Sequence, residues 1–190
     1  MPRLLAVVAA VTLPGRLNAA VQSAVEFAGS QPCVSATQLV LADYRLSFAD
    51  GRPPEQFRDD SGHVVRMVAE ADVVLLASPV YRASFTGALK NLLDLTPVEA
   101  LCGKPVGIVA MGARPHHYLG IDSHLRAILA WFGALVAPTS VYLEPCHFRE
   151  GKLADPAARS ALIALVTAVL ALTEVPRDRL GPPPLASDPR

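Results

Sequence analysis

The chain has 190 residues, of which 52% are hydrophobic and 18% are charged; this length suits one domain, and so apolar a composition excludes an intrinsically disordered chain. Its 17 basic and 17 acidic residues cancel to a formal net charge of zero, which disfavours a nucleic-acid-binding protein because such proteins carry a basic excess. The low charge and a mean hydropathy of +0.35 indicate a surface that a second subunit covers, so we expect a homodimer or homotetramer.

Strand-like and helix-like segments alternate along the chain. Five apolar runs are typical of strands buried in a sheet, at residues 4–11, 35–41, 73–77, 105–111 and 139–143. Each is followed by a segment with helical features, at residues 18–29, 60–71, 87–95, 119–132 and 156–172. This alternation predicts a three-layer α/β/α fold whose five-stranded parallel sheet has the order 2-1-3-4-5.

The ends of the predicted strands indicate where a ligand binds. In a doubly wound sheet, ligands bind beyond the carboxyl ends of the strands, near the switch point between the first and third strands. The site is therefore expected in the loops that follow Val11, Ala77 and Met111. Residues 1–175 are expected to form this one domain, and the Pro-rich residues 176–190 an extended or disordered tail.

Three further features of the sequence bear on the cellular compartment, on membrane-spanning segments and on metal sites. The three cysteines include no CxxC pair, which predicts reduced thiols in a cytoplasmic protein rather than a disulfide framework or a zinc site. The longest clean apolar helical segment, residues 161–173, is shorter than the roughly 18 residues that span a bilayer, so no membrane segment is expected. His116 and His117 are adjacent and lack an acidic partner nearby, so no metal site is predicted.

The most specific stretch is residues 77–95, ASPVYRASFTGALKNLLDL. It resembles the NAD(P)H-dependent FMN reductase family of the flavodoxin-like fold, whose members carry a similar run. Within that family, the chain most resembles the alkanesulfonate-type reductases, which supply reduced FMN to a partner monooxygenase. The resemblance covers about residues 4–148, and it implies that the helix at residues 87–95 also packs against a second subunit.

The resemblance implies that the first loop holds the phosphate of FMN. Thr12, Arg16 and Asn18 are the candidates there: Arg16 is a two-pronged donor, and the N-terminus of the following helix, which Asn18 is expected to cap, favours an anion. The family usually has Gly-Ser in this loop, where the chain has Ala9-Ala10.

The resemblance assigns the flavin ring to the other two loops. Pro79, Val80 and Tyr81 are expected to shape one edge of the isoalloxazine, because Pro79 stiffens the loop and Tyr81 can lie beside the ring. Gly112 and Ala113 are expected at the other edge, where the family has Thr-Gly-Gly.

Two arginines are candidates for the second substrate. Arg82 and Arg114 are placed where they can meet the phosphate groups of NADH or NADPH, and no local motif decides between the two nucleotides. The alkanesulfonate-type reductases also carry a bulky residue as a helix bulge, and the aligned position here is Ser123.

The expected activity is hydride transfer from the nicotinamide C4 to the flavin N5, with no catalytic side chain required because the cofactor carries the chemistry. Three alternatives remain. Bound FMN can pass electrons to a quinone-type acceptor. A flavodoxin-like electron carrier is disfavoured by the balanced charge. A descendant that has lost FMN and serves as a scaffold, or in other chemistry, is favoured by the alanines at positions 9, 10 and 113.

Overall fold

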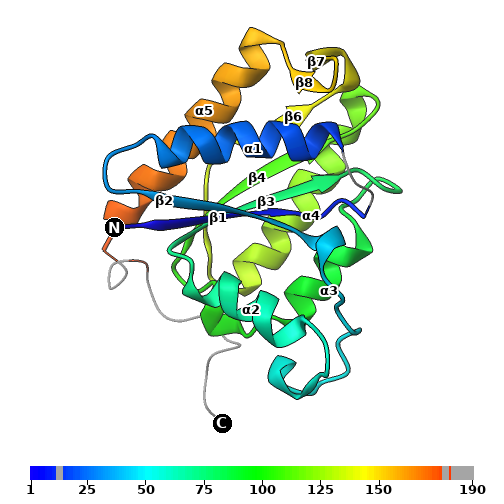
Figure 1. Cartoon of the computed structure of the whole chain (residues 1–190), viewed down its shortest axis with the longest axis vertical. Helices are drawn as coiled ribbons and strands as arrows, with labels where there is room; N and C mark the ends of the chain where they lie inside the picture. The colour runs from blue at the N-terminus through cyan, green and yellow to red at the C-terminus, as the bar shows by residue number, and fades with distance from the viewer. Residues whose placement is uncertain (12–14, 177–179, 181–190) are drawn as a thin grey trace.

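The computed structural model describes residues 1–11, 15–176 and 180, and within these residues the chain forms three layers around one parallel sheet (Figure 1). The strands are β1 (Arg3–Val8), β2 (Ser35–Val40), β3 (Val73–Pro79), β4 (Pro105–Met111), β5 (Leu135–Val136) and β6 (Val141–Leu143). Their order is β2-β1-β3-β4-β5, with every pairing parallel. The predicted flavodoxin-like fold and strand order are therefore confirmed.

The fifth position of the sheet differs from the single strand predicted at residues 139–143. Two short strands, β5 and β6, both pair with β4. Between them the Ala137 N–H still donates to the Val106 carbonyl at 2.9 Å, but Pro138 follows and has no N–H to donate. The ladder therefore breaks at the proline, as expected for a residue that cannot continue a sheet.

The α-helices cover both faces of the sheet, and the apolar character of the strands explains why. The helices of the described residues are α1 (Arg16–Gly29), α2 (Ser61–Glu70), α3 (Gly87–Leu95), α4 (Tyr118–Trp131) and α5 (Pro156–Ala171). Helices α1 and α5 pack on one face and α2, α3 and α4 on the other. Side chains of β1 alternate between the two cores, so a strand buried on both faces is a continuous apolar run.

A small antiparallel hairpin was not predicted from the sequence. Its strands are β7 (Phe148–Arg149) and β8 (Lys152–Leu153). The turn between them contains Glu150 at φ 49° and Gly151 at φ 77°, a left-handed pair that closes two-residue hairpins. Phe148 and Leu153 are buried in the core of α1 and α5, so the hairpin is attached to the layer that holds α1.

Helix α5 begins where the sequence analysis placed it and ends within one residue of the predicted end. Together with the 3₁₀ turn η6 (Leu172–Glu174), it forms a 19-residue helix, Pro156–Glu174, that is long and apolar enough to cross a membrane by length and composition alone. The sequence analysis compared only residues 161–173 with the length of a membrane span; the helix also includes residues 156–160, where Asp155 accepts a hydrogen bond from Ala158 N–H at 2.8 Å as its N-cap. One face, which includes Leu162 and Val166, packs on the sheet.

Candidate functional site

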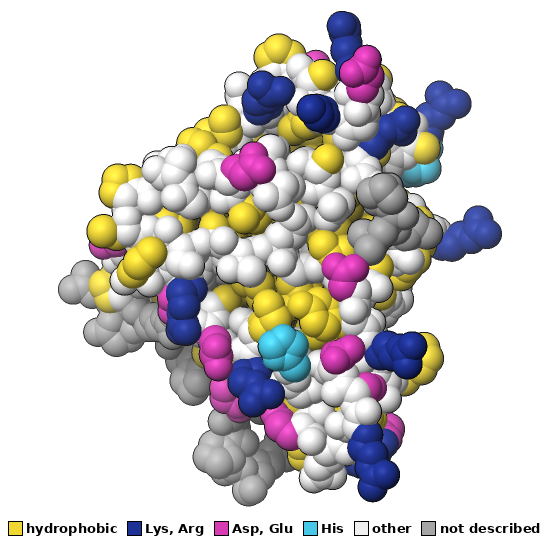
Figure 2. Space-filling view, in the orientation of Figure 1, with side chains coloured by type: hydrophobic (Ala, Val, Ile, Leu, Met, Phe, Trp, Pro, Cys, Tyr) yellow, Lys and Arg dark blue, Asp and Glu magenta, His cyan; other side chains and the backbone are white. Residues whose placement is uncertain are grey.

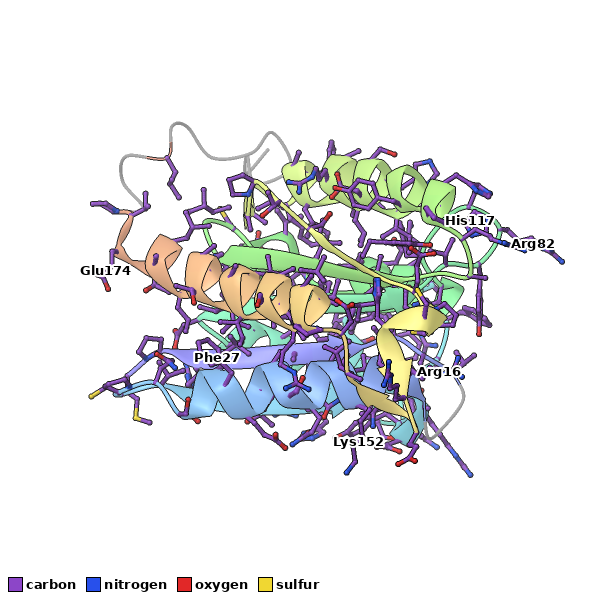
Figure 3. All side chains as sticks on the ribbon, turned by 90° about the horizontal axis from the view of Figure 1, so that it is seen from above. Arg16, Phe27, Arg82, His117, Lys152 and Glu174 are labelled. Atoms are coloured by element: carbon purple, nitrogen blue, oxygen red, sulfur yellow. The ribbon has the colours of Figure 1, made fainter. Side chains whose placement is uncertain are left out.

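The loops that follow β1, β3 and β4 meet at one edge of the sheet, because the strands are parallel. Figure 3 shows Arg16, Arg82 and His117 at this end of the molecule and Glu174 at the other end. Figure 2 shows several basic side chains along the side toward which the strands run. The same view shows acidic side chains among the basic ones, so the structure brings the predicted loops together at a rim of mixed charge.

The first loop continues β1 for one more residue. The Ala9 N–H donates to the Ala77 carbonyl at 2.7 Å, and the Ala9 methyl is buried in the core beneath α2 and α3. Because this side chain points into the core, alanine in place of the family's glycine does not obstruct the rim. Thr12 lies outside the described residues.

Among the described residues, the N-terminus of α1 has no side-chain cap. The helix begins at Arg16, with Gly15 as the N-cap, so the prediction that Asn18 caps the helix was wrong. Gly15 has no side chain to cap the first turn, and that turn holds no acidic residue. The Asn18 side chain instead accepts a hydrogen bond from Gln38 Nε2 at 2.7 Å, which directs it toward β2. The first-turn N–H groups and the exposed Arg16 can together hold a phosphate.

Buried hydroxyls close the base of the second loop. Ser78 Oγ accepts from the Thr86 N–H at 3.0 Å and donates to the Pro79 carbonyl at 2.9 Å. Thr86 Oγ1 donates to the Ala9 carbonyl at 2.8 Å and accepts from the Leu89 N–H at 3.2 Å. The sequence analysis missed both residues, although a threonine just before a helix is an N-cap signal.

The tip of the second loop is a tight turn made without glycine. Tyr81 and Ser84 exchange two backbone hydrogen bonds, of 2.8 and 3.0 Å, and the residues between them, Arg82 and Ala83, have φ values of 51° and 62°. Such turns normally contain Asn-Gly, because side chains disfavour positive φ. The turn projects Tyr81, which is 48% exposed, and Arg82 at the rim. The Val80 N–H donates to the Met111 carbonyl at 2.8 Å, which fixes the start of the loop.

Tyr142 holds the third loop in place. Its hydroxyl donates to the Arg114 carbonyl at 2.6 Å, while the Gly112 N–H donates to the Leu143 carbonyl at 3.0 Å. A Cβ at Gly112 would lie 2.1 Å from the Tyr142 hydroxyl, so a larger residue requires Tyr142 or the third loop to move. Burial, assisted by the charge of Glu144, raises the pKa of Tyr142 and keeps the phenol a donor. Ala113 and Arg114 lie exposed beyond it.

A group of potential metal ligands lies after β6. Glu144, Cys146 and His147 each present a ligand atom, and these atoms lie within 4.8 Å of one another. However, His147 Nδ1 accepts a hydrogen bond from the Glu144 N–H at 3.1 Å. A neutral imidazole whose Nδ1 accepts carries its proton on Nε2, so neither ring nitrogen offers a free lone pair to a metal ion. This arrangement favours a loop-fixing role for His147.

Comparison with known proteins identifies the family. Residues 2–147 match the family described as NADPH-dependent FMN reductase. The chain belongs to this family. It is 40% identical over 140 residues to the NAD(P)H-dependent FAD/FMN reductase of Geobacillus thermodenitrificans, covering 73% of this chain and 76% of the relative. It is 36% identical over 112 residues to the NADH-dependent FMN reductase SfnF of Pseudomonas putida, covering 59% and 60%.

Solved structures agree with the fold of this reductase. The apo form of an NADH:FMN oxidoreductase (EMOB) superposes with a TM-score of 0.78 over 94% of each chain at 22% sequence identity, which shows the fold alone. The family confirms the predictions of an oxidoreductase and of FMN and NAD(P)H as its cofactor and co-substrate. The α1 N-terminus without a side-chain cap and the exposed Tyr81 lie at the same edge of the sheet, which is compatible with a flat ring that carries an anionic tail.

Proposed function

We propose that this FMN reductase binds FMN across the three loops and transfers a hydride from the nicotinamide C4 of NADH or NADPH to the flavin N5. The flavin supplies the redox chemistry, and the protein supplies binding, orientation and electrostatics. The observation that carries the proposal is the uncapped N-terminus of α1 at the same edge of the sheet as the fixed second and third loops.

The phosphate end of FMN is assigned to the first loop. Arg16 donates from its guanidinium, and the first-turn amides of α1 add the positive end of the helix dipole. Asn18 contributes through its backbone N–H, because its side chain is engaged by Gln38. Thr12 is retained as a hydroxyl donor from the sequence alone.

The ring and the second substrate are assigned to the other loops. Pro79, Val80 and Tyr81 border one edge of the isoalloxazine, and Gly112 and Ala113 border the other. The bonds from Val80 to Met111 and from Gly112 to Leu143 hold these two edges at a set spacing. In addition, Arg82 and Arg114 are exposed at the rim, where they can bind the phosphates of NAD(P)H.

The wider setting follows from the resemblance and the surface. We propose that reduced FMN leaves for a partner monooxygenase, as in the alkanesulfonate-type reductases, and that residues 1–175 act as one cytoplasmic domain. Most of residues 176–190, where the sequence analysis expected a tail, lie outside the described residues. Exposed apolar side chains, among them Phe48 at 85% and Trp131 at 60% exposure, support a homodimer or homotetramer. Light scattering after size exclusion gives the oligomeric mass, and a monomer would remove this part of the proposal.

The activity is tested by following NADH and NADPH oxidation while free FMN is varied. We expect oxidation to depend on FMN and to saturate with it, because FMN is used as a substrate by a reductase that releases it. A rate independent of added FMN in protein that retains its flavin would favour the quinone-type alternative. No oxidation, together with no quenching of FMN fluorescence, would favour the protein that has lost FMN.

Arg16→Ala is expected to weaken FMN binding at least tenfold, about 1.4 kcal/mol, because it removes the charged donor from the phosphate site. Fluorescence quenching gives the dissociation constant. Riboflavin lacks the phosphate, so its affinity should not change, and Arg66→Ala on the exposed side of α2 serves as the matched control. Equal FMN affinities of the wild type and Arg16→Ala would exclude Arg16 from the phosphate site.

A further inference from the structure

The turn at Arg82 and Ala83 needs support from outside itself. Both residues have positive φ values, and neither is glycine, so the isolated segment would favour other conformations. The two backbone bonds between Tyr81 and Ser84 close the turn but do not remove this preference. Positive φ values at two successive non-glycine residues persist where contacts with the surrounding structure stabilise them.

Helix α4 supplies such support along one face. A Cβ built at Gly120 would lie 2.2 Å from the Ala83 carbonyl oxygen, so the helix backbone lies directly against the turn. One helical turn further on, His124 Nδ1 and Ser84 Oγ share a hydrogen bond of 3.0 Å. Residues four apart lie on the same side of a helix, and α4 runs without a bulge from Tyr118 to Trp131, including the Ser123 position.

We propose that His124 is a positioning residue of the reductase: through Ser84, and together with the contact at Gly120, it holds the Arg82-Ala83 turn in its left-handed conformation. This proposal rests on the function proposed above. The turn carries Tyr81 toward the flavin edge and Arg82 toward the pyridine nucleotide. The His124–Ser84 bond and the Gly120 contact, together called the brace, therefore set where the second substrate binds. The proposed phosphate site at the N-terminus of α1 lies on a different loop and does not depend on the Arg82-Ala83 turn.

The first test compares His124→Ala and Ser84→Ala with His63→Ala, a matched control for an exposed histidine on α2. Each test variant is expected to raise KM for NAD(P)H on the order of tenfold, since misplaced binding groups lose orientation, while the FMN dissociation constant stays within about twofold. His124→Asn keeps a short hydrogen-bonding group and should recover much of the loss. An unchanged KM in both alanine variants would overturn the proposal.

A double variant asks whether the two residues act as one unit. His124→Ala combined with Ser84→Ala should be no worse than either single variant, because both remove the same bond. Ala83→Gly should also reduce the effect of His124→Ala, because glycine adopts a positive φ without penalty. A role of His124 in helix stability alone would give additive losses and no relief from Ala83→Gly, and that result would contradict the brace.

Hydrogen exchange of the protein without flavin gives a readout that is independent of activity. The amides of Tyr81 and Ser84 are expected to exchange about tenfold faster in His124→Ala than in the wild type, and to return toward the wild-type rate in His124→Asn. Equal exchange rates would reject the brace. If the wild type fails to oxidise NAD(P)H with FMN, the proposed function fails, whereas the exchange rates still decide whether α4 holds the turn.

Discussion

Gly112→Ala is expected to reduce FMN affinity by more than about tenfold, one of the two largest effects anticipated for this reductase. The new Cβ would lie 2.1 Å from the Tyr142 hydroxyl and 3.1 Å from both Tyr142 Cζ and Val80 Cγ2. The hydroxyl is the end of a side chain, but its 2.6 Å bond to the Arg114 carbonyl holds it in place. Either Tyr142 moves and frees the third loop, or that loop moves and displaces Val80.

Two further variants distinguish a movement of Tyr142 from a movement of the third loop. Tyr142→Phe loses only the hydrogen bond and should weaken FMN binding less than Gly112→Ala does. The double variant combines Gly112→Ala with Tyr142→Phe. It lacks the hydroxyl that clashes with the new methyl group, so part of the FMN affinity should return. Gly29→Ala, at the end of α1, is the control, because a Cβ there meets nothing within 4 Å. Fluorescence titration checks each protein, and a folded Gly112→Ala with wild-type affinity would show that the third loop does not border the flavin.

Thr86→Val is expected to lower the free energy of unfolding by about 3 kcal/mol, combining a lost helix cap with buried partners left unpaired. Thr86 is 2% exposed. Valine has nearly the same shape but no hydroxyl, so the Ala9 carbonyl and the Leu89 N–H would lose the partner they share. The effect is large because one hydroxyl joins the end of β1 to the start of α3.

Urea unfolding followed by circular dichroism measures this loss. Thr86→Ser keeps the hydroxyl and removes only a methyl group, so it should cost about 1 kcal/mol. If Thr86→Val unfolds with the same free energy as Thr86→Ser, the hydroxyl bonds make no net contribution, and the closure of the second loop must come from Ser78 and from packing.

The sequence predicted the sheet because the physical signal is local. Strands such as β3 and β4 are buried on both faces, so residues 73–77 and 105–111 form nearly continuous apolar runs. Gly29 and Pro156, which bound two of the predicted helices, are the last residue of α1 and the first residue of α5. The weakest predictions fell at interruptions of the pattern: Pro138 divides the fifth position of the sheet, and Gly15 rather than Asn18 caps α1.

The sequence alone therefore determined the order of the elements, the family resemblance in residues 77–95, and the three loops that form the candidate site. Tertiary structure alone decided which side chains hold those loops. Thr86 meets Ala9 across 77 residues, Ser84 meets His124 across 40, and Tyr142 meets Arg114 across 28. The hydrophobic periodicity of a segment indicates only which of its residues are buried. These hydrogen bonds depend instead on how the folded sheet and helices bring distant segments together.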